Sequence, residues 1–197
     1  KNKLSFVRFD CRGHGKSSGR FEDFTISDWK DDLLYVIDKL TNGPQILIGS
    51  SMGGWLMMLA SQSRPKKIIG LIGLAAATDF GDDLYKNLTI KNKKDLKKEG
   101  ITKYKTYGLS YFLTSKFFID AKKNNILNKP LHFKNPIILI HGLSDKVVNS
   151  NVPKKIMEIS TCKNFHILYL KSSNHRLSEA NDLITINNTI DNIRSLI

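Results

Sequence analysis

Short apolar stretches of strand length alternate along this chain with stretches of helical character. Strands are predicted at residues 4–9, 45–49, 67–76, 135–142 and 164–170, and helices at 25–40, 51–63, 153–160 and 178–197. The predicted strands are apolar almost throughout, so both faces of the sheet that they form must be covered. The alternation therefore predicts an α/β fold, in which a mostly parallel sheet carries helices on both faces.

Residues 81–134 interrupt this alternation between the third and fourth predicted strands. The segment is rich in lysine and contains helix-like pieces such as KKDLKKE. Loops at the carboxyl edge of a parallel sheet are where such folds bind ligands, so we expect a small helical cap above that edge. The expected organisation is a first part of the core at 1–80, a cap or lid at 81–134 and a second part of the core at 135–197.

The formal net charge of the chain is +13, and its pI is near 9.7. A basic surface attracts nucleic acid, anionic lipid or acidic substrates. Lysine, asparagine and isoleucine are abundant along the whole chain, however, and the arginine-plus-aromatic pattern of nucleic-acid binders is absent. We interpret the charge as compositional bias and expect no nucleic-acid partner. No apolar run approaches the ~20 residues of a membrane span, so stable membrane insertion is not expected.

The stretch DCRGHGKSSG, residues 10–19, contains Gly15-Lys16-Ser17, which is how a phosphate-binding P-loop ends. In the pattern G-x-x-x-x-G-K-[ST] the first glycine would fall at Asp10, whose carboxylate would repel phosphate. The residues from Ser17 to Gly19 favour loop conformations, so no helix is expected to begin at Lys16. Nucleotide binding is therefore disfavoured, and these glycines need another explanation.

A nucleophile motif lies between the second predicted strand and the helix that follows it. The sequence GSSMG matches G-x-S-x-G, in which a serine sits on a sharp strand-to-helix turn and the residues two positions away must be small. Gly49 and Gly53 flank Ser51 at that spacing, whereas Ser50 would be flanked by bulky residues. Ser51 is therefore the candidate nucleophile, and the amide of Met52 is a candidate oxyanion donor.

A serine nucleophile needs a histidine base and an acid that orients it, in this fold type in the chain order serine, acid, histidine. His175 lies in a polar loop after the last predicted strand, and Asp145 follows the strand before it. They are the candidate base and acid, with Asp79 after the third strand as the alternative acid. The other histidines precede the nucleophile or the acid, lie in the lid or alternate within a strand: His14, His141, His132 and His166.

The motifs RFDCRGHGKSSG, GSSMGGWLM, HGLSD and NHRLSE follow one another in this order. Together they resemble the α/β-hydrolase superfamily over the whole chain. GSSMGGW, the Arg-Pro pair after it, HG…D and the final HR are similar to the mitochondrial palmitoyl-protein thioesterase and acyl-glucuronide esterase family and its bacterial relatives. The resemblance implies that Ser51, Asp145 and His175 form a catalytic triad, and that the glycines of residues 10–19 serve turn geometry.

These observations predict a serine hydrolase that cleaves an ester or thioester of an acyl chain through an acyl-enzyme on Ser51. The alternative is a non-catalytic basic binding module on the same scaffold. Neither a metal nor an organic cofactor is implied, and Cys11 and Cys162 have no disulfide-framework or metal-site spacing. The expected location is a bacterial cytoplasm or, alternatively, the mitochondrial matrix. Thioesters, acyl glucuronides and simple carboxylic esters all stay open as substrates.

The family pattern also includes N-terminal strands and an oxyanion loop that do not match any part of this chain. We therefore expect the chain to belong to a longer protein, with roughly 40 to 60 further N-terminal residues. The strand missing between residues 4–9 and 45–49 would leave a gap of about 9 to 10 Å in the sheet. A chain without it is expected to be poorly soluble and nearly inactive, because one oxyanion donor is lost.

Overall fold

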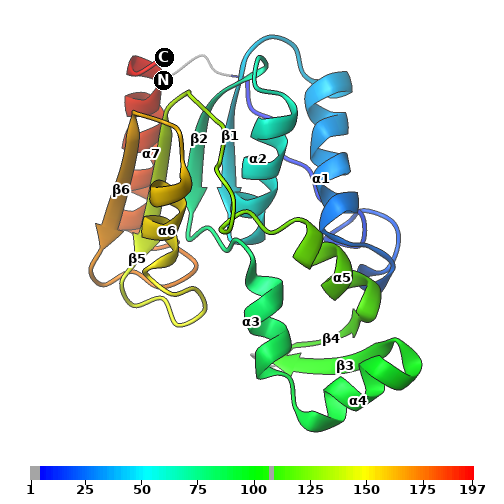
Figure 1. The fold of residues 1–197 in the computed structure, drawn as a ribbon. Coiled ribbons are helices and arrows are strands. Elements are labelled where there is room, and N and C mark those ends of the chain that lie inside the picture. Colours follow the sequence, from blue (N-terminus) through cyan, green and yellow to red (C-terminus); the bar gives the residue numbers. More distant parts are fainter. Residues whose placement is uncertain (1–4, 107–108) are drawn as a thin grey trace. The chain divides into compact units, whose positions relative to one another are not determined.

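The computed structural model describes residues 5–106 and 109–197. The fold is α/β, as predicted (Figure 1). Residue contacts divide the chain into two compact units, one of residues 1–42 and 81–123 and the other of residues 43–80 and 124–197. Among the described residues, no helix is long and apolar enough to cross a membrane.

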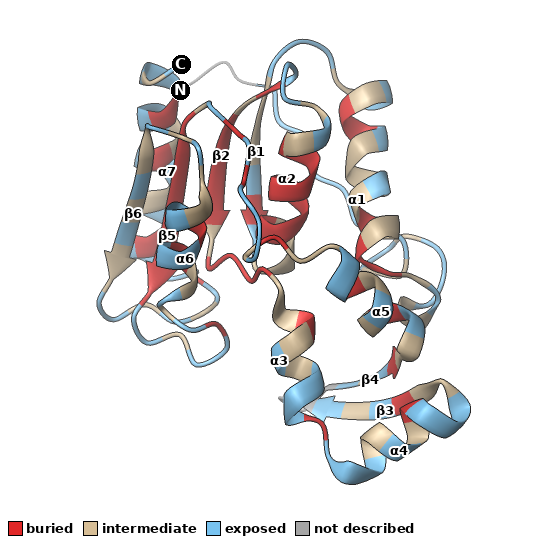
Figure 2. Ribbon diagram, in the orientation of Figure 1, coloured by how far each residue is buried: buried red, intermediate tan, exposed pale blue. Residues whose placement is uncertain are grey.

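The unit of residues 43–80 and 124–197 contains a parallel sheet. Its strands lie in the order β1 (Gln45–Ser50), β2 (Ile68–Leu74), β5 (Ile137–Gly142) and β6 (Phe165–Leu170). Every neighbouring pair is parallel, and each strand coincides closely with a stretch predicted from its apolar residues. β5 is buried along its whole length (Figure 2), which explains its unbroken apolar sequence.

Helices cover both faces of this sheet. They are α2 (Met52–Ser63), α6 (Val152–Ile159) and α7 (Ala180–Ser195), close to the predicted ranges. Gly70 and Gly73 of β2 point to opposite faces, because their positions differ by an odd number. A Cβ on Gly70 would meet Ile193 of α7, and a Cβ on Gly73 would meet Met57 of α2. The helices α2 and α7 therefore bury opposite faces of the sheet.

The other unit is built mainly from helices. Its elements are η1 (Phe21–Asp23), α1 (Ile26–Tyr35), η2 (Val36–Leu40), α3 (Phe80–Asn87, whose first residue belongs to the sheet unit), α4 (Ile90–Glu99), β3 (Ile101–Thr106), β4 (Leu109–Thr114) and α5 (Ser115–Lys123). A capping box starts α1, since the Thr25 N–H donates to the Asp28 carboxylate (2.9 Å). The helix predicted at 25–40 is thus confirmed, with its last five residues in a wider π-helical turn.

Residues 81–134, predicted as a helical lid, also contain a β-hairpin. Strand β3 pairs antiparallel with β4, and Thr102 and Leu113 form a buried pair within it. Exposed lysines at 103 and 105 alternate with more buried residues, a period-2 pattern that the high lysine content of the segment obscures. The boundary between the two units falls inside this segment, after Lys123. The division into core and lid stays a prediction.

The strand predicted at residues 4–9 is wrong for the residues that the structure describes. Residues 5–9 form no strand, and Phe6 and Val7 are 77% and 51% exposed, while Leu4 lies outside the described residues. An apolar stretch becomes a strand only when a neighbouring strand supplies its hydrogen-bond partners. None of the described strands pairs with residues 5–9. The expected gap in the sheet and the expected further N-terminal residues stay predictions.

The loop at residues 10–19 folds around its own carboxylate. Asp10 accepts a hydrogen bond from the Lys16 N–H (3.0 Å), and the Asp10 carbonyl oxygen accepts one from Ser17 Oγ (2.6 Å). Gly13 and Gly15 have φ values of 72° and 52°, which glycine adopts without strain. These glycines therefore serve turn geometry, and an amide that a P-loop would offer to phosphate is already occupied.

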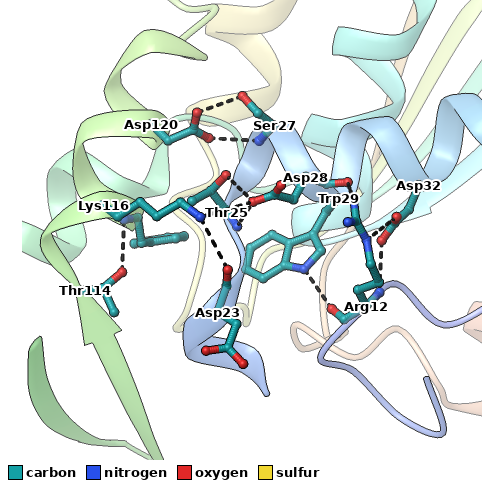
Figure 3. A network of polar contacts seen from close by, with 11 residues as sticks. Arg12, Asp23, Thr25, Ser27, Asp28, Trp29, Asp32, Thr114, Lys116 and Asp120 are labelled. Atoms are coloured by element: carbon teal, nitrogen blue, oxygen red, sulfur yellow. Dashed lines mark hydrogen bonds and ion pairs between the residues drawn. The ribbon is translucent and has the colours of Figure 1, made fainter. Parts of the chain in front are cut away.

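Hydrogen bonds attach this loop to α1 (Figure 3). Arg12 donates from Nε and from its backbone N–H to the Asp32 carboxylate (2.6 and 2.9 Å), and Trp29 Nε1 donates to the Arg12 carbonyl oxygen (2.9 Å). On the other side of α1, Ser27 donates from its N–H and Oγ to the carboxylate of Asp120 on α5 (2.8 and 2.7 Å). Hydrogen bonds to two carboxylates thus connect the loop, α1 and α5 within this unit.

Candidate active site

Ser51 occupies the sharp turn between β1 and α2. Its φ of 51° and ψ of −119° place a non-glycine residue in a sparsely populated region, at a cost of about 1–3 kcal/mol. The Ser51 N–H donates to the Leu74 carbonyl (2.9 Å), and the Ser51 carbonyl accepts from the Ala77 N–H (3.0 Å). These bonds to the end of β2 and to the residues after it hold the strained serine in place.

The glycines near Ser51 differ in whether the surrounding atoms leave space for a Cβ. A Cβ on Gly49 would overlap the Gly53 carbonyl group and lie 2.7 Å from Gly54 N, so no larger residue fits there. A Cβ on Gly53 would meet nothing within 4 Å. The predicted need for a small residue therefore holds at Gly49 and is wrong at Gly53. Gly54 is a second restricted position, because its Cβ would lie 2.5 Å from Ala76 Cβ.

His175 connects Ser51 to Asp145 by two hydrogen bonds. Its Nδ1 lies 2.8 Å from Asp145 Oδ2, and its Nε2 lies 3.0 Å from Ser51 Oγ. Ser51 follows β1, Asp145 follows β5 and His175 follows β6, so the ends of parallel strands bring them to one edge of the sheet. An ionised carboxylate can only accept, so Nδ1 carries the proton and Nε2 accepts the serine hydroxyl.

The side chain of Asp145 is fully buried and is held ionised by its hydrogen bonds. Its Oδ1 accepts the N–H groups of Val147 (2.7 Å) and Val148 (3.0 Å), and its Oδ2 accepts from His175. Burial by itself raises the pKa of a carboxyl group, but here the hydrogen bonds outweigh it, and the pKa of Asp145 lies below its ordinary value. A negative charge is therefore directed at His175.

His141, the histidine of the HGLSD motif, supports the loop that carries Asp145. It is fully buried, and its Nε2 lies 3.2 Å from the Val148 carbonyl oxygen and 3.7 Å from Asp145 Oδ2. Burial lowers the pKa of His141, so its ring is neutral. Because a carbonyl only accepts, the proton of His141 lies on Nε2. This bond fixes Val148, whose own amide holds the Asp145 carboxylate.

Gly142, the next residue of that motif, has no side chain and so leaves room for the loop that carries His175. A Cβ on Gly142 would overlap the Ser173 carbonyl group and lie 3.0 Å from the Asn174 carbonyl oxygen. The Ser173 carbonyl also accepts the Ser144 N–H (3.0 Å), so the two loops are in backbone contact. The sequence patterns assign no role to Gly142. Its place as the last residue of a buried strand, three residues before the acid, is the signal that could have found it.

The alternative acid and the alternative serine have other surroundings. Asp79 accepts the backbone N–H groups of Ile126 (2.9 Å) and Leu127 (2.8 Å), so its carboxylate holds a loop. Ser50 is the exposed last residue of β1. Neither makes a described hydrogen bond to the imidazole of His175, whose two nitrogens contact Asp145 and Ser51.

The remaining histidines are likewise outside this hydrogen-bonded chain. His132 is exposed in the loop before β5. His166 is exposed on β6 and pairs with the side chain of Asn164 (2.9 Å). His14, in the other unit, packs edge-on against Phe21 and Trp29. Among the described hydrogen bonds, His175 is the histidine that contacts both a serine and an acid, whereas His14, His132 and His166 contact neither Ser51 nor Asp145.

Met52 is the first residue of α2. Amides in the first turn of a helix have no partner within it, and the helix dipole favours negative charge at that end. The Met52 N–H can therefore donate to an oxyanion formed beside Ser51. Over residues 5–106 and 109–197, no group of three or more His, Cys, Asp and Glu side chains is suited to holding a metal ion.

A protein-family model described as serine aminopeptidase, S33, matches residues 1–104 of this chain. The solved structure of alpha/beta hydrolase domain-containing protein 10 from mouse is 31% identical to it, with a TM-score of 0.86, and the match covers 95% of this chain and 76% of the mouse chain. The chain belongs to the α/β-hydrolase family. The fold class and the family resemblance predicted from the motifs are confirmed.

Further relatives of this α/β-hydrolase carry the description "Palmitoyl-protein thioesterase ABHD10, mitochondrial". The human protein is 35% identical over 191 residues, covering 95% of this chain and 62% of the human one, and the bovine protein is 34% identical over 193 residues, covering 96% and 63%. A putative hydrolase from Agrobacterium vitis S4 is 28% identical with a TM-score of 0.88, covering 94% and 75%. The α/β-hydrolase thus spans less than two thirds of the length of its human and bovine relatives.

Proposed function

We propose that this α/β-hydrolase is a serine hydrolase that cleaves carboxylic esters or thioesters of acyl chains. The observation that carries the proposal is the hydrogen-bonded chain Ser51–His175–Asp145 on a strained strand-to-helix turn. It supplies a nucleophile, a base within reach of it and a buried acid that orients the base. The description of the human and bovine relatives as thioesterases supports the substrate class.

In the first half of the reaction Ser51 Oγ attacks the carbonyl carbon of the substrate while His175 Nε2 takes its proton. The carbonyl oxygen becomes an oxyanion, which accepts a hydrogen bond from the Met52 N–H. When the oxyanion collapses, the bond to the leaving oxygen or sulfur breaks, and His175 gives the proton to the leaving alcohol or thiol. The acyl group is then bonded to Ser51 as an ester.

In the second half a water molecule attacks this acyl ester. His175 Nε2 takes a proton from the water and returns it to Ser51 Oγ as the carboxylic acid leaves. Asp145 stays ionised throughout and stabilises the imidazolium that forms in each half. The lowered pKa of Asp145 supports this role, because a carboxyl group whose pKa lies below its ordinary value keeps its charge at neutral pH.

A fluorophosphonate probe tests whether Ser51 is activated, because the probe reacts with an activated serine by loss of fluoride and needs no particular acyl substrate. In the complete protein we expect labelling of the unmodified form, none in Ser51→Ala and nearly full labelling in Ser50→Ala, the matched control one residue away. Failure of the folded protein to label, or labelling that depends on Ser50, contradicts the proposal. The first of these results favours a non-catalytic binding module.

Three substrates separate the classes that the sequence leaves open. The rates to compare are those for a short p-nitrophenyl ester, a long-chain acyl thioester and an acyl glucuronide. A kcat/KM that is highest for the thioester supports the class named for the human and bovine relatives. In each case Ser51→Ala should lower the rate on the order of 10⁴-fold or more.

A further inference from the structure

Figure 1 shows the helices α3, α4 and α5. Side chains of these three helices line a groove of about 900 Å³. Its lining residues all lie between Gly81 and Lys122, so the groove is formed within a single unit of the chain. Pockets for small organic ligands usually measure about 300–1,000 Å³. The groove is therefore large enough for a ligand of that kind.

The floor of the groove is apolar and aromatic. Tyr85 of α3 and Phe118 of α5 pack edge to face, with ring centroids 5.2 Å apart. Ile90 and Ile119 also line the groove, and they are 77% and 60% exposed. Removing apolar surface of this kind from water is favourable, by about 25 cal/mol per Å². The floor therefore favours a hydrocarbon chain.

Lysines surround this floor. Besides Asp82, the charged lining residues are Lys86, Lys93, Lys94, Lys97 and Lys122. Three of these lysines follow Ile90 at helical spacing, so they share one face of α4. Lys86 lies near Asp83 (3.5 Å), and Lys93 Nζ lies 5.7 Å from the centre of the Tyr85 ring. Within the described residues, Lys94, Lys97 and Lys122 make no ion pair.

We propose that this groove binds a single-chain anionic amphiphile, with its hydrocarbon chain on the Tyr85–Phe118 floor and its phosphate group among the lysines. The excess of lysine over aspartate selects an anionic head group, for which lysine acts as a point charge. The concave apolar floor selects one alkyl chain over free phosphate and over a flat membrane surface. The inference goes beyond the proposed hydrolysis and does not depend on it, because binding requires no reaction at Ser51.

Calorimetric titration with dodecyl phosphate below its micelle concentration tests the proposal. The comparison ligands are dodecyl maltoside, whose head group is neutral, and inorganic phosphate, which has no chain. We expect dodecyl phosphate to bind at least about 10-fold more tightly than either, and its Kd to rise with salt as the lysine–phosphate attraction is screened. Equal affinity for inorganic phosphate or for dodecyl maltoside overturns the proposal.

A charge-removing variant localises the binding to the groove. The triple change Lys94→Gln, Lys97→Gln and Lys122→Gln should weaken dodecyl phosphate binding by about 10-fold, since each exposed pair contributes a modest amount. All three side chains are exposed, so thermal unfolding should be unchanged. The matched control applies the same change to three exposed lysines of the other unit: Lys129, Lys154 and Lys163.

Two further outcomes decide the inference. If both triple variants weaken binding equally, the attraction comes from the overall charge and the groove is not the site. If the protein binds vesicles of anionic phospholipid but not monomeric dodecyl phosphate, the ligand is a membrane surface and the proposal is wrong. The variant Ile119→Asn, which makes the exposed floor polar, should weaken dodecyl phosphate binding and leave inorganic phosphate unaffected.

Discussion

Alanine at Gly49 should disable the proposed active site, whereas alanine at Gly53, the other glycine of G-x-S-x-G, should not. A Cβ on Gly49 would lie 2.7 Å from Gly54 N and would overlap the Gly53 carbonyl group. Ordinary contacts begin near 3.4 Å, so the contact with Gly54 N alone requires the first turn of α2 to move by about 0.7 Å, and the overlap with the Gly53 carbonyl group requires more.

This displacement has a cost in stability and a cost in rate. Overpacking of this kind typically costs about 1–3 kcal/mol. The same turn carries Ser51, whose Oγ lies 3.0 Å from His175 Nε2. A misplacement of ~1 Å in reacting groups can cost ~10²-fold in rate. For Gly49→Ala we therefore expect a loss of about 1–3 kcal/mol in unfolding free energy and about 10- to 100-fold slower fluorophosphonate labelling.

Urea unfolding and the rate of probe labelling measure the two effects. Gly53→Ala is the control, because its Cβ meets nothing within 4 Å and alanine favours the helical conformation found there. Its stability should stay within about 1 kcal/mol of the unmodified protein. If Gly49→Ala is as stable and reacts as fast as Gly53→Ala, the close approach of β1 to α2 is not the reason for glycine at position 49.

Two further changes examine the acid and the buried histidine. Asp145→Asn should slow labelling on the order of 10⁴-fold. Asp79→Asn should mainly lower stability, by about 1–3 kcal/mol, because Asp79 holds the amides of residues 126 and 127. Similar labelling rates in the two variants would remove Asp145 from its proposed role. Burial lowers the pKa of His141 below its ordinary value of 6.5, so the unfolded chain takes up a proton there at a higher pH than the folded chain does. Stability should therefore fall as the pH drops below about 6.5, and His141→Gln should flatten this slope in urea midpoints; an unchanged slope would refute the assignment.

The sequence by itself determined the sheet of the unit of residues 43–80 and 124–197 and the three side chains that meet at the edge of that sheet. Parallel strands that are buried on both faces must be apolar throughout, so short apolar stretches of the sequence predict the strands β1, β2, β5 and β6. All parallel strands end at the same edge, so residues directly after them lie near one another whatever their distance along the chain. The sequence therefore predicts that Ser51, Asp145 and His175 lie close together, and two hydrogen bonds join them in the structure.

Other features depended on tertiary structure, because the residues adjacent in the sequence do not reveal which distant residue a side chain or strand will contact. Residues 5–9 are as apolar as a strand but have no described strand to pair with. Asp79 and Asp145 both follow buried strands, and only their surroundings separate an acid that contacts His175 from one that holds a loop. The glycine motif likewise does not reveal that the close contact falls on Gly49, because that contact is created only when α2 packs back against β1.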